Sequence, residues 1–216
     1  MKIDTDSAIA RHLEDIAPAD DEFFESMRAA ALEAGIPSIS IDKAQASMIQ
    51  AALRAIGAKE VVEVGTLFGG TALRMARALP EDGRVRTFEI ESKHADFAEH
   101  WIARSDAAGK VEVHRGDARE TLPRVPDASI DAMFIDADKV GYETYIAEAA
   151  RVLRDHGLLL VDNAFAFGDL LDESCTDESV LAIRAVNDNL RQNPLFEGSI
   201  VPLGDGFWFC TRVARA

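Results

Sequence analysis

The chain has only two cysteines, Cys175 and Cys210, among its 216 residues. Neither lies beside a base-bearing motif or in a metal-ligand pair, which excludes a disulfide framework and a cysteine-based metal site. The five histidines show no ligand spacing either, and we interpret all of them as surface or packing residues: His12, His94, His100, His114 and His156. The sequence therefore lacks the ligands that softer metal ions prefer.

Basic residues and long apolar runs are also scarce. The 23 Lys and Arg residues are outnumbered by 38 Asp and Glu, giving a formal net charge of -15, and such a surface repels nucleic-acid phosphates and anionic membranes. The longest strongly apolar run, around Leu158–Val161, is too short to cross a bilayer. The N-terminus has no apolar stretch of signal-peptide length. We therefore expect a cytoplasmic protein with no nucleic-acid or membrane partner.

The hydrophobic residues, 48% of the chain, suffice for one well-buried core, so we predict a single domain over residues 1–216. Helical patterns such as Thr71–Leu79 and Tyr142–Leu153 alternate with short aliphatic runs. Five strands are predicted from these runs: Glu60–Val64, Val85–Ile90, Val111–His114, Ile130–Ile135 and Gly157–Asp162. This alternation predicts an α/β fold with a mostly parallel sheet and helices on both faces.

The two ends of the chain differ from this pattern. Strand candidates around Ser199–Pro202 and Phe207–Val213 are separated only by Leu203–Gly206. So short a link permits a hairpin but no crossover helix, so we expect this last pair to be antiparallel. The first sixty residues are expected to be mostly helical, with an extended piece around Pro37–Ile41.

A glycine-bearing segment, Gly65–Thr71, follows the first predicted strand. Glycines here let the backbone turn sharply and let a ligand approach the N-terminus of the next helix. A dinucleotide-binding fingerprint would require glycine at Leu67, and it is absent. This absence argues against an NAD-binding oxidoreductase, which is the first rival function.

Two acidic residues accompany these glycines. Glu63 lies at the end of the first strand and Glu89 ends the second. A carboxylate at Glu63 would repel a pyrophosphate and attract a cationic ligand, while Glu89 stands where an acid can accept hydrogen bonds from a ribose diol. The pair favours a cationic nucleoside, as in a sulfonium cofactor. The alternative is that Glu63 caps a turn and Glu89 is solvated.

The fourth and fifth predicted strands also end in polar residues. Asp136, Asp138 and Lys139 follow the fourth strand, and Asp162 and Asn163 follow the fifth. Because ligands of open parallel sheets bind beyond the carboxyl ends of the strands, we expect Asp136, Asp162 and Asn163 to converge. Such oxygen ligands suit Mg²⁺ or a similar ion. The alternative is a solvated acidic rim.

Lys139 is the natural proton acceptor of this predicted site. Beside a dication its charged form is disfavoured, which favours a neutral amine that acts as general base. The alternative is a surface lysine that pairs with Asp138. Phe165, Phe167 and Trp208 could flank a planar acceptor, or pack in the core.

Together these residues resemble the cation-dependent class I O-methyltransferases, which include catechol and caffeoyl-CoA O-methyltransferases and their bacterial relatives. The resemblance runs from about Ile39 to Val213. Its discriminating pieces are the run Asp136–Lys139 with Tyr142 and Tyr145, and the pair Asp162-Asn163. The remaining matching pieces are Glu63–Thr66, Gly69, Glu89, Gly116–Ala118, Asn187 and Pro202–Gly206.

The resemblance implies a seven-stranded, Rossmann-like methyltransferase fold with an antiparallel last strand, and usually a homodimer. It assigns Asp136, Asp162 and Asn163 as ligands of Mg²⁺, or of another divalent ion such as Mn²⁺ or Ca²⁺. Asp136 and Lys139 would be the catalytic residues, with Lys139 as the general base. S-adenosylmethionine would contact ten residues: Ile41, Glu63, Gly65, Thr66, Gly69, Thr71, Glu89 at the ribose, Ala118 near the adenine, Asp136 and Asp138.

The implied reaction is methyl transfer to a vicinal diol, either a catechol or a hydroxycinnamoyl-like small molecule. The chain departs from the family at Ile39-Ser40 and Gly70-Thr71, and it lacks the tryptophan often found shortly after Asn163. These departures concern the acceptor pocket, which residues 1–40 and 164–180 are expected to shape; residues 1–40 could serve a dimer instead. Two more rival functions stay open: a non-catalytic S-adenosylmethionine-binding protein, and an O-methyltransferase for a sugar or natural-product hydroxyl.

Overall fold

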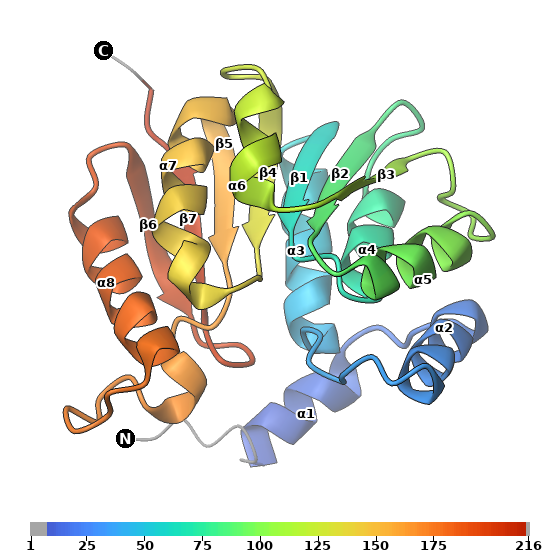
Figure 1. Ribbon diagram of the computed structural model, residues 1–216, viewed down its shortest axis with the longest axis horizontal. Helices are drawn as coiled ribbons and strands as arrows, with labels where there is room; N and C mark the ends of the chain where they lie inside the picture. The colour runs from blue at the N-terminus through green and yellow to red at the C-terminus, as the bar shows by residue number, and fades with distance from the viewer. Residues whose placement is uncertain (1–7, 215–216) are drawn as a thin grey trace.

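The computed structural model describes residues 8–214 and contains one seven-stranded sheet with the order β3-β2-β1-β4-β5-β7-β6 (Figure 1). Strands β1 to β5 run parallel, and β7 lies antiparallel between β5 and β6. The predicted fold and the antiparallel final pair are confirmed. The strands are β1 (Glu60–Val64), β2 (Arg84–Glu89), β3 (Val111–Arg115), β4 (Ile130–Ile135), β5 (Leu153–Val161), β6 (Phe196–Val201) and β7 (Phe207–Arg212).

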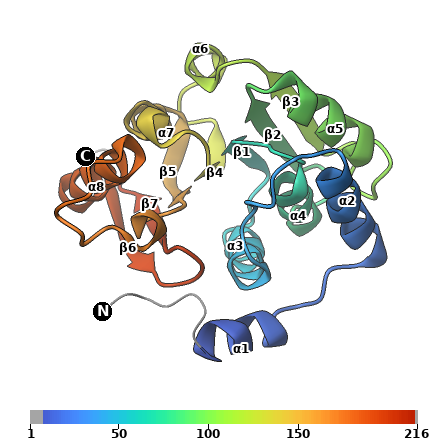
Figure 2. The same ribbon diagram turned by 60° about the horizontal axis from the view of Figure 1, so that its bottom comes forward.

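Helices cover both faces of this sheet, and Figure 2 shows the two groups on opposite sides of it. The first group comprises α2 (Glu22–Glu33), α3 (Lys43–Ala55), α4 (Gly70–Ala78) and α5 (Ser92–Ile102). The second comprises α6 (Ala118–Thr121), α7 (Tyr142–Val152) and α8 (Glu178–Gln192). The described residues also form three short 3-10 turns: η1 (Leu122–Arg124), η2 (Lys139–Gly141) and η3 (Ala166–Gly168).

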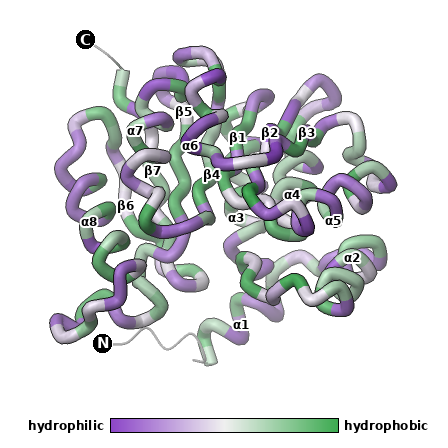
Figure 3. Tube along the Cα trace, in the orientation of Figure 1, coloured by the Kyte–Doolittle hydropathy of each residue, from purple (hydrophilic) through white to green (hydrophobic). Residues whose placement is uncertain are grey.

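The central strands bury both of their faces, which explains their nearly continuous hydrophobic sequences (Figure 3). In β4, Phe134 packs into the core beneath α3 and α4, whereas Met133 and Ile135 pack into the core beneath α7. Side chains alternate between the faces of a strand, so a strand covered on both sides must be apolar at successive positions. The polar residues that follow these strands are therefore the first ones free to face a ligand.

Strand β5 starts earlier than the sequence indicated, at Leu153 rather than Gly157. Its pairing with β4 shifts between Ile130↔Leu153 and Ala132↔Leu158, and His156 takes a positive φ of 63° within the intervening segment. The predicted helix accordingly ends one residue sooner, at Val152. A bulge of this kind has no periodicity signal, because its extra residues are unpaired.

Charged side chains of the N-terminal segment tie it to α3 and α4, while the apolar face of α2 packs in the core. Asp20 forms an ion pair with the buried Arg74 of α4 at 2.6 Å, and the Arg74 guanidinium lies 4.1 Å from the Phe24 ring centroid. Helix α1 (Ala8–Ile16) has no buried residue, but its Glu14 carboxylate accepts the backbone N–H of Ala44 in α3 at 2.9 Å. None of the helices between residues 8 and 214 is long and apolar enough to span a membrane.

Candidate active site

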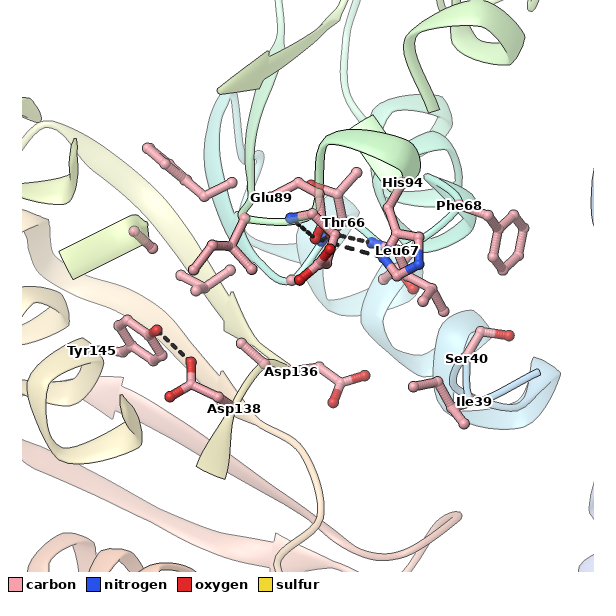
Figure 4. A pocket seen from close by; sticks show the side chains of 18 of the residues that line it. Ile39, Ser40, Thr66, Leu67, Phe68, Glu89, His94, Asp136, Asp138 and Tyr145 are labelled. Atoms are coloured by element: carbon pink, nitrogen blue, oxygen red, sulfur yellow. Dashed lines mark hydrogen bonds and ion pairs between the residues drawn. The ribbon is translucent and has the colours of Figure 1, made fainter. Parts of the chain in front are cut away.

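A cavity of about 410 Å³ opens beyond the carboxyl ends of β1, β2 and β4. This is where ligands of open parallel sheets bind, and the volume lies within the range of small-molecule sites. Figure 4 shows Glu89 and Thr66 on one side of it, with Asp136, Asp138 and Tyr145 on the other. The cavity therefore joins the two polar clusters that the sequence places at separate strand ends.

The loop from β1 to α4 forms one wall of the cavity and requires glycine at its first position. Gly65 has a φ of +99°, and a Cβ placed there would lie 1.9 Å from the backbone oxygen of Asp136. No side chain fits in that gap, so glycine lets the loop cross closely over the end of β4. The same approach brings the backbone of Thr66 and Leu67 to the cavity wall.

Glu89 fixes this loop to the end of β2. Its Oε2 accepts the N–H of Thr66 at 3.1 Å and of Leu67 at 2.7 Å, and its Oε1 accepts the N–H of Glu91 at 2.9 Å. The side chain is buried, so the solvated alternative for Glu89 is wrong. A carboxylate held by three backbone donors presents its remaining lone pairs in a fixed direction.

Glu63 does not line the cavity. It is fully buried within β1, where its Oε2 accepts the hydroxyl of Thr87, which in turn shares a hydrogen bond with the hydroxyl of Thr66. Its Oε1 has no partner among the described residues, and burial raises the pKa of Glu63 well above its usual range. The turn-capping alternative for Glu63 is wrong as well, because this residue lies inside the strand.

The ends of β4 and β5 bring Asp136 and Asp162 side by side. Ile135 and Val161 are register partners, and the N–H of Asp162 donates to the Ile135 backbone oxygen at 3.0 Å. Adjacent strands lie about 4.8 Å apart, so the residues that follow this pair leave the sheet together. Burial, and then the nearby charge of Asp136, raise the pKa of the Asp162 carboxyl to about 7.

Lys139 lies within the same cluster. Its Nζ donates to Asp136 Oδ1 at 3.1 Å and to the hydroxyl oxygen of Tyr142 at 2.7 Å. Asp138 does not pair with this lysine, because its Oδ1 accepts the Tyr145 hydroxyl at 2.7 Å. The alternative of a surface lysine paired with Asp138 is therefore wrong: the amine lies at the cavity beside the buried end of β4.

Asn163 joins the cluster from the loop after β5, in a left-handed conformation with a φ of 62°. Its Nδ2 donates to Asp205 Oδ2 at 3.3 Å, and the same oxygen accepts the Phe167 backbone N–H at 2.8 Å. Because the amide nitrogen is directed at Asp205, the amide oxygen of Asn163 stays available to another group. Asp205 was part of a matching motif, but no role was predicted for it.

The described residues fit a divalent cation that prefers oxygen ligands. They include no group of three or more His, Cys, Asp and Glu side chains able to hold a metal ion, so the predicted set depends on the amide oxygen of Asn163. Asp136 and Asp162 place two neighbouring carboxylates beside one ammonium group, that of Lys139. Oxygen donors with unbalanced negative charge are what hard dications require.

The structure brings most of the predicted site residues to one cavity. Nine of them line it: Gly65, Thr66, Thr71, Glu89, Ala118, Asp136, Asp138, Lys139 and Asn163. Four do not: Ile41, Glu63, Gly69 and Asp162. Ile41 is buried in the core, and Gly69 packs against Ala98 and Ile102 where α4 begins. Asp162 lies just behind the wall, where the Gln45 side chain holds it.

Sequence reasoning missed several wall residues. His94, interpreted as a surface or packing residue, lines the cavity with its Nδ1 at 3.7 Å from Glu89 Oε1. Its position in the first helical turn after Glu89 was the available signal. Ile39 and Ser40 line the cavity in place of Ile41.

The three aromatic candidates separate clearly. Phe167 lines the cavity and stays 58% exposed, and its ring centroid lies 6.0 Å from Lys139 Nζ. Phe165 does not line it and packs against Gly206, where a Cβ would lie 2.5 Å from its ring. Trp208 is a core residue whose Nε1 donates to Asn187 at 2.7 Å. Of these three, Phe167 alone is placed to contact an acceptor.

Comparison with known proteins agrees with this geometry. A family model described as O-methyltransferase matches residues 14–213. Catechol O-methyltransferase of Niastella koreensis is 32% identical over 91% of this chain and 90% of that protein, and the catechol O-methyltransferase of Mycobacterium tuberculosis is 36% identical over 77% of this chain and 76% of that protein.

Two of the similar solved structures contain SAH or SAM. The Bacillus cereus O-methyltransferase in complex with SAH has a TM-score of 0.88 and 27% identity, covering 95% of this chain and 97% of that one. TomG of Streptomyces achromogenes, solved with SAM, has a TM-score of 0.87 and 25% identity, covering 96% of this chain and 97% of that one. The chain therefore belongs to the class I O-methyltransferases, a family of enzymes that use S-adenosylmethionine.

Proposed function

We propose that this enzyme transfers the methyl group of S-adenosylmethionine to one hydroxyl of a small vicinal diol of the catechol type, with the help of a bound divalent cation. The observation that carries the proposal is the cluster of Asp136, Asn163 and Lys139 in the wall of a cavity that Glu89 also lines, with Asp162 directly behind that wall. Relatives named catechol O-methyltransferase support the acceptor class.

The half of the cavity around Glu89 would hold the cofactor. Glu89 is oriented by three backbone donors and can still accept the ribose hydroxyls. Ala118, at the start of α6, leaves room for a flat adenine ring beside the Gly116 turn. The acidic residues of this wall favour the cationic sulfonium over a phosphate-bearing ligand.

The opposite half would bind the acceptor. Asp136, Asp162 and Asn163 would hold the divalent cation, with Mg²⁺ as the first candidate and Mn²⁺ or Ca²⁺ as alternatives. When bound, such an ion polarises the acceptor oxygen and lowers the pKa of its hydroxyl. Phe167 supplies an exposed aromatic face beside Lys139 for the ring of the diol.

Lys139 would take the proton from the acceptor hydroxyl. The Asp136 carboxylate and the Tyr142 hydroxyl hold its Nζ in place at the cavity wall. A base fixed in this way meets the hydroxyl without a search through side-chain conformations, which is the benefit of orientation in catalysis. The hydroxyl oxygen then attacks the methyl carbon in line with the sulfur, and the sulfonium leaves as a neutral thioether.

The same proposal includes a homodimer of single-domain chains. Ile39 and Ser40 line the cavity, which supports a role of the N-terminal segment in the acceptor pocket. Ile9 and Ile16 of α1 are 73% and 65% exposed, which supports a role of α1 in contacts between subunits.

Methyl transfer to a panel of acceptors, with S-adenosylmethionine and Mg²⁺, tests the proposal. We expect turnover with catechol and 3,4-dihydroxycinnamic compounds, and none with phenols that carry a single hydroxyl. Turnover of sugars or aliphatic diols alone would favour an enzyme of natural-product or sugar methylation. Calorimetry in which NAD binds and S-adenosylmethionine does not would contradict the proposed cofactor.

A further inference from the structure

Gln45 and Asp162 form a buried hydrogen bond between two distant parts of the chain. The Gln45 Nε2 donates to Asp162 Oδ1 at 2.6 Å, across 117 positions of the sequence. Gln45 is 1% exposed and Asp162 is 7% exposed. No motif singled out Gln45, and it does not line the cavity. A carboxylate this deeply buried needs a donor, because its desolvation is otherwise unfavourable.

The surroundings of Gln45 fix its backbone on one side and confine its side chain on the other. Asp42 caps α3 by accepting the Gln45 backbone N–H at 2.6 Å, and Glu14 of α1 accepts the N–H of Ala44 at 2.9 Å. On the opposite side, Gly204 approaches so closely that a Cβ there would lie 2.8 Å from Gln45 Oε1. The amide therefore has little freedom to turn away from Asp162.

The two residues after β5 are held in the same manner. Gln45 engages one oxygen of Asp162 and leaves Oδ2 without a side-chain donor among residues 8–214. Asp205 engages the nitrogen of Asn163 and leaves its amide oxygen without one in the same part of the chain. Each partner thus binds one atom of its neighbour and leaves an oxygen with no side-chain donor, which is how outer residues orient the ligands of a metal ion.

We propose that Gln45 is a positioning residue that aims Asp162 at the divalent cation and thereby sets the affinity of the enzyme for that ion. This inference rests on the proposed function, because it requires the cation. It adds a residue from α3 to a site otherwise built from the loops after β4 and β5. A role of Gln45 in packing alone predicts lower stability with unchanged metal affinity.

The variant Gln45→Met tests this inference, because methionine keeps the length and unbranched shape of glutamine but has no N–H donor. Gln50→Met is the matched control: Gln50 lies in the same helix and donates its Nε2 to the Arg74 backbone oxygen at 2.7 Å, away from the site. Mn²⁺ affinity is measured by the electron paramagnetic resonance signal of the free ion, with S-adenosylmethionine present. Cofactor affinity is measured separately by calorimetry.

Gln45→Met should bind Mn²⁺ about 10- to 100-fold more weakly than the unaltered enzyme, the usual effect of losing an outer-sphere partner. Its affinity for S-adenosylmethionine should stay within twofold, and Gln50→Met should match the unaltered enzyme in both. Mn²⁺ affinity of Gln45→Met within twofold of the unaltered enzyme would overturn the inference, as would an equal loss of cofactor affinity. Absence of Mn²⁺ binding by the unaltered enzyme would instead refute the metal part of the proposed function, and the inference with it.

A measurement on the unaltered protein covers the case in which Gln45→Met does not fold. The side-chain amide signals of glutamine are resolved in ¹H–¹⁵N spectra, and Mg²⁺ binding to Asp162 changes the charge next to Gln45 Nε2. Titration with Mg²⁺ should therefore shift the Gln45 side-chain signal and leave that of Gln50 in place. A Gln45 signal that stays fixed while the backbone signals of Asp136 and Asn163 move would contradict the inference.

Discussion

The Lys139 Nζ lies 3.1 Å from Asp136 Oδ1 and 2.7 Å from the Tyr142 hydroxyl oxygen, at the wall of the cavity that Glu89 also lines. One amine thus connects a predicted metal ligand with a buried phenol. Tyr142 is fully buried at the start of α7, so this contact ties the amine to the core. The lysine is therefore fixed at the cavity wall before any acceptor binds, as the proposed role of a general base requires.

Replacing this amine should remove proton transfer and leave cofactor binding intact. We expect Lys139→Met to lower kcat about 10²- to 10⁴-fold, the usual contribution of a general base. The affinity for S-adenosylmethionine, measured by calorimetry, should change less than threefold. Lys59→Met is the control, because Lys59 pairs with Asp82 at the amino-terminal ends of β1 and β2, away from the cavity. Equal losses in kcat and cofactor affinity would assign Lys139 to cofactor binding instead.

We expect Glu89 to contribute to the affinity of the enzyme for S-adenosylmethionine. In Glu89→Gln the side chain keeps its size, but the three backbone donors and the ribose lose a charged acceptor. Hydrogen bonds to charged groups contribute about 1.5–3 kcal/mol, so affinity for S-adenosylmethionine should fall about ten- to a hundredfold. Calorimetry of this variant beside Glu60→Gln, whose carboxylate pairs with Arg86 at the far end of β1, makes the comparison. Unchanged affinity would exclude Glu89 from the ribose site.

Phe167 should affect the KM for the acceptor and leave the KM for S-adenosylmethionine unchanged. Phe167→Ala removes the exposed ring beside Lys139, and aromatic pairs contribute about 0.5–1.5 kcal/mol beyond their buried area. The KM for a catechol should rise about two- to tenfold, with the KM for S-adenosylmethionine unchanged in steady-state kinetics. Leu171→Ala serves as control, since Leu171 is 77% exposed and does not line the cavity. A KM that rises equally in both variants would mean that the whole loop is disturbed.

Glu63 should make stability depend on pH. Its folded-state pKa is raised by burial, so the folded protein keeps a proton that the unfolded chain releases above about pH 4.5. The contribution of Glu63 to the free energy of unfolding should therefore fall as the pH rises above about 4.5. Glu63→Gln has no carboxyl group at this position and should not show that fall. Urea unfolding without ligands should show the variant gaining stability relative to the unaltered protein between pH 5 and pH 8. Parallel stability profiles would mean that Glu63 is ionised in the folded state.

The sequence was sufficient to predict the two polar strand ends because local rules determine them. Ala132–Ile135 and Leu158–Val161 are apolar on both faces, so Asp136 and Asp162 are the first polar residues after these buried runs. Parallel register then brings the two together. The sharp turn at Gly65 was also predictable, because a glycine directly follows the first strand. The structure gives the physical reason: a side chain at Gly65 would collide with the Asp136 backbone.

Contacts between distant segments were not predictable in this way. Gln45 reaches Asp162 from an N-terminal helix, and Asp205 reaches Asn163 from the last hairpin. Neither contact leaves a spacing signal in one sequence, because both depend on how α3 and the β6–β7 turn pack. Glu63 shows the complementary case: its residue type suggested a ligand contact, but its place in β1 buries it away from the cavity wall.

Removal of the divalent cation tests the central claim most directly. Enzyme that has been treated with a chelator, from which the chelator is then removed, should no longer methylate a catechol. Added Mg²⁺ should restore this activity in a saturable manner. Asp162→Ala should stay inactive at every Mg²⁺ concentration while still binding S-adenosylmethionine. Full activity in the presence of excess chelator would contradict the claim that Asp136, Asp162 and Asn163 hold a catalytic cation.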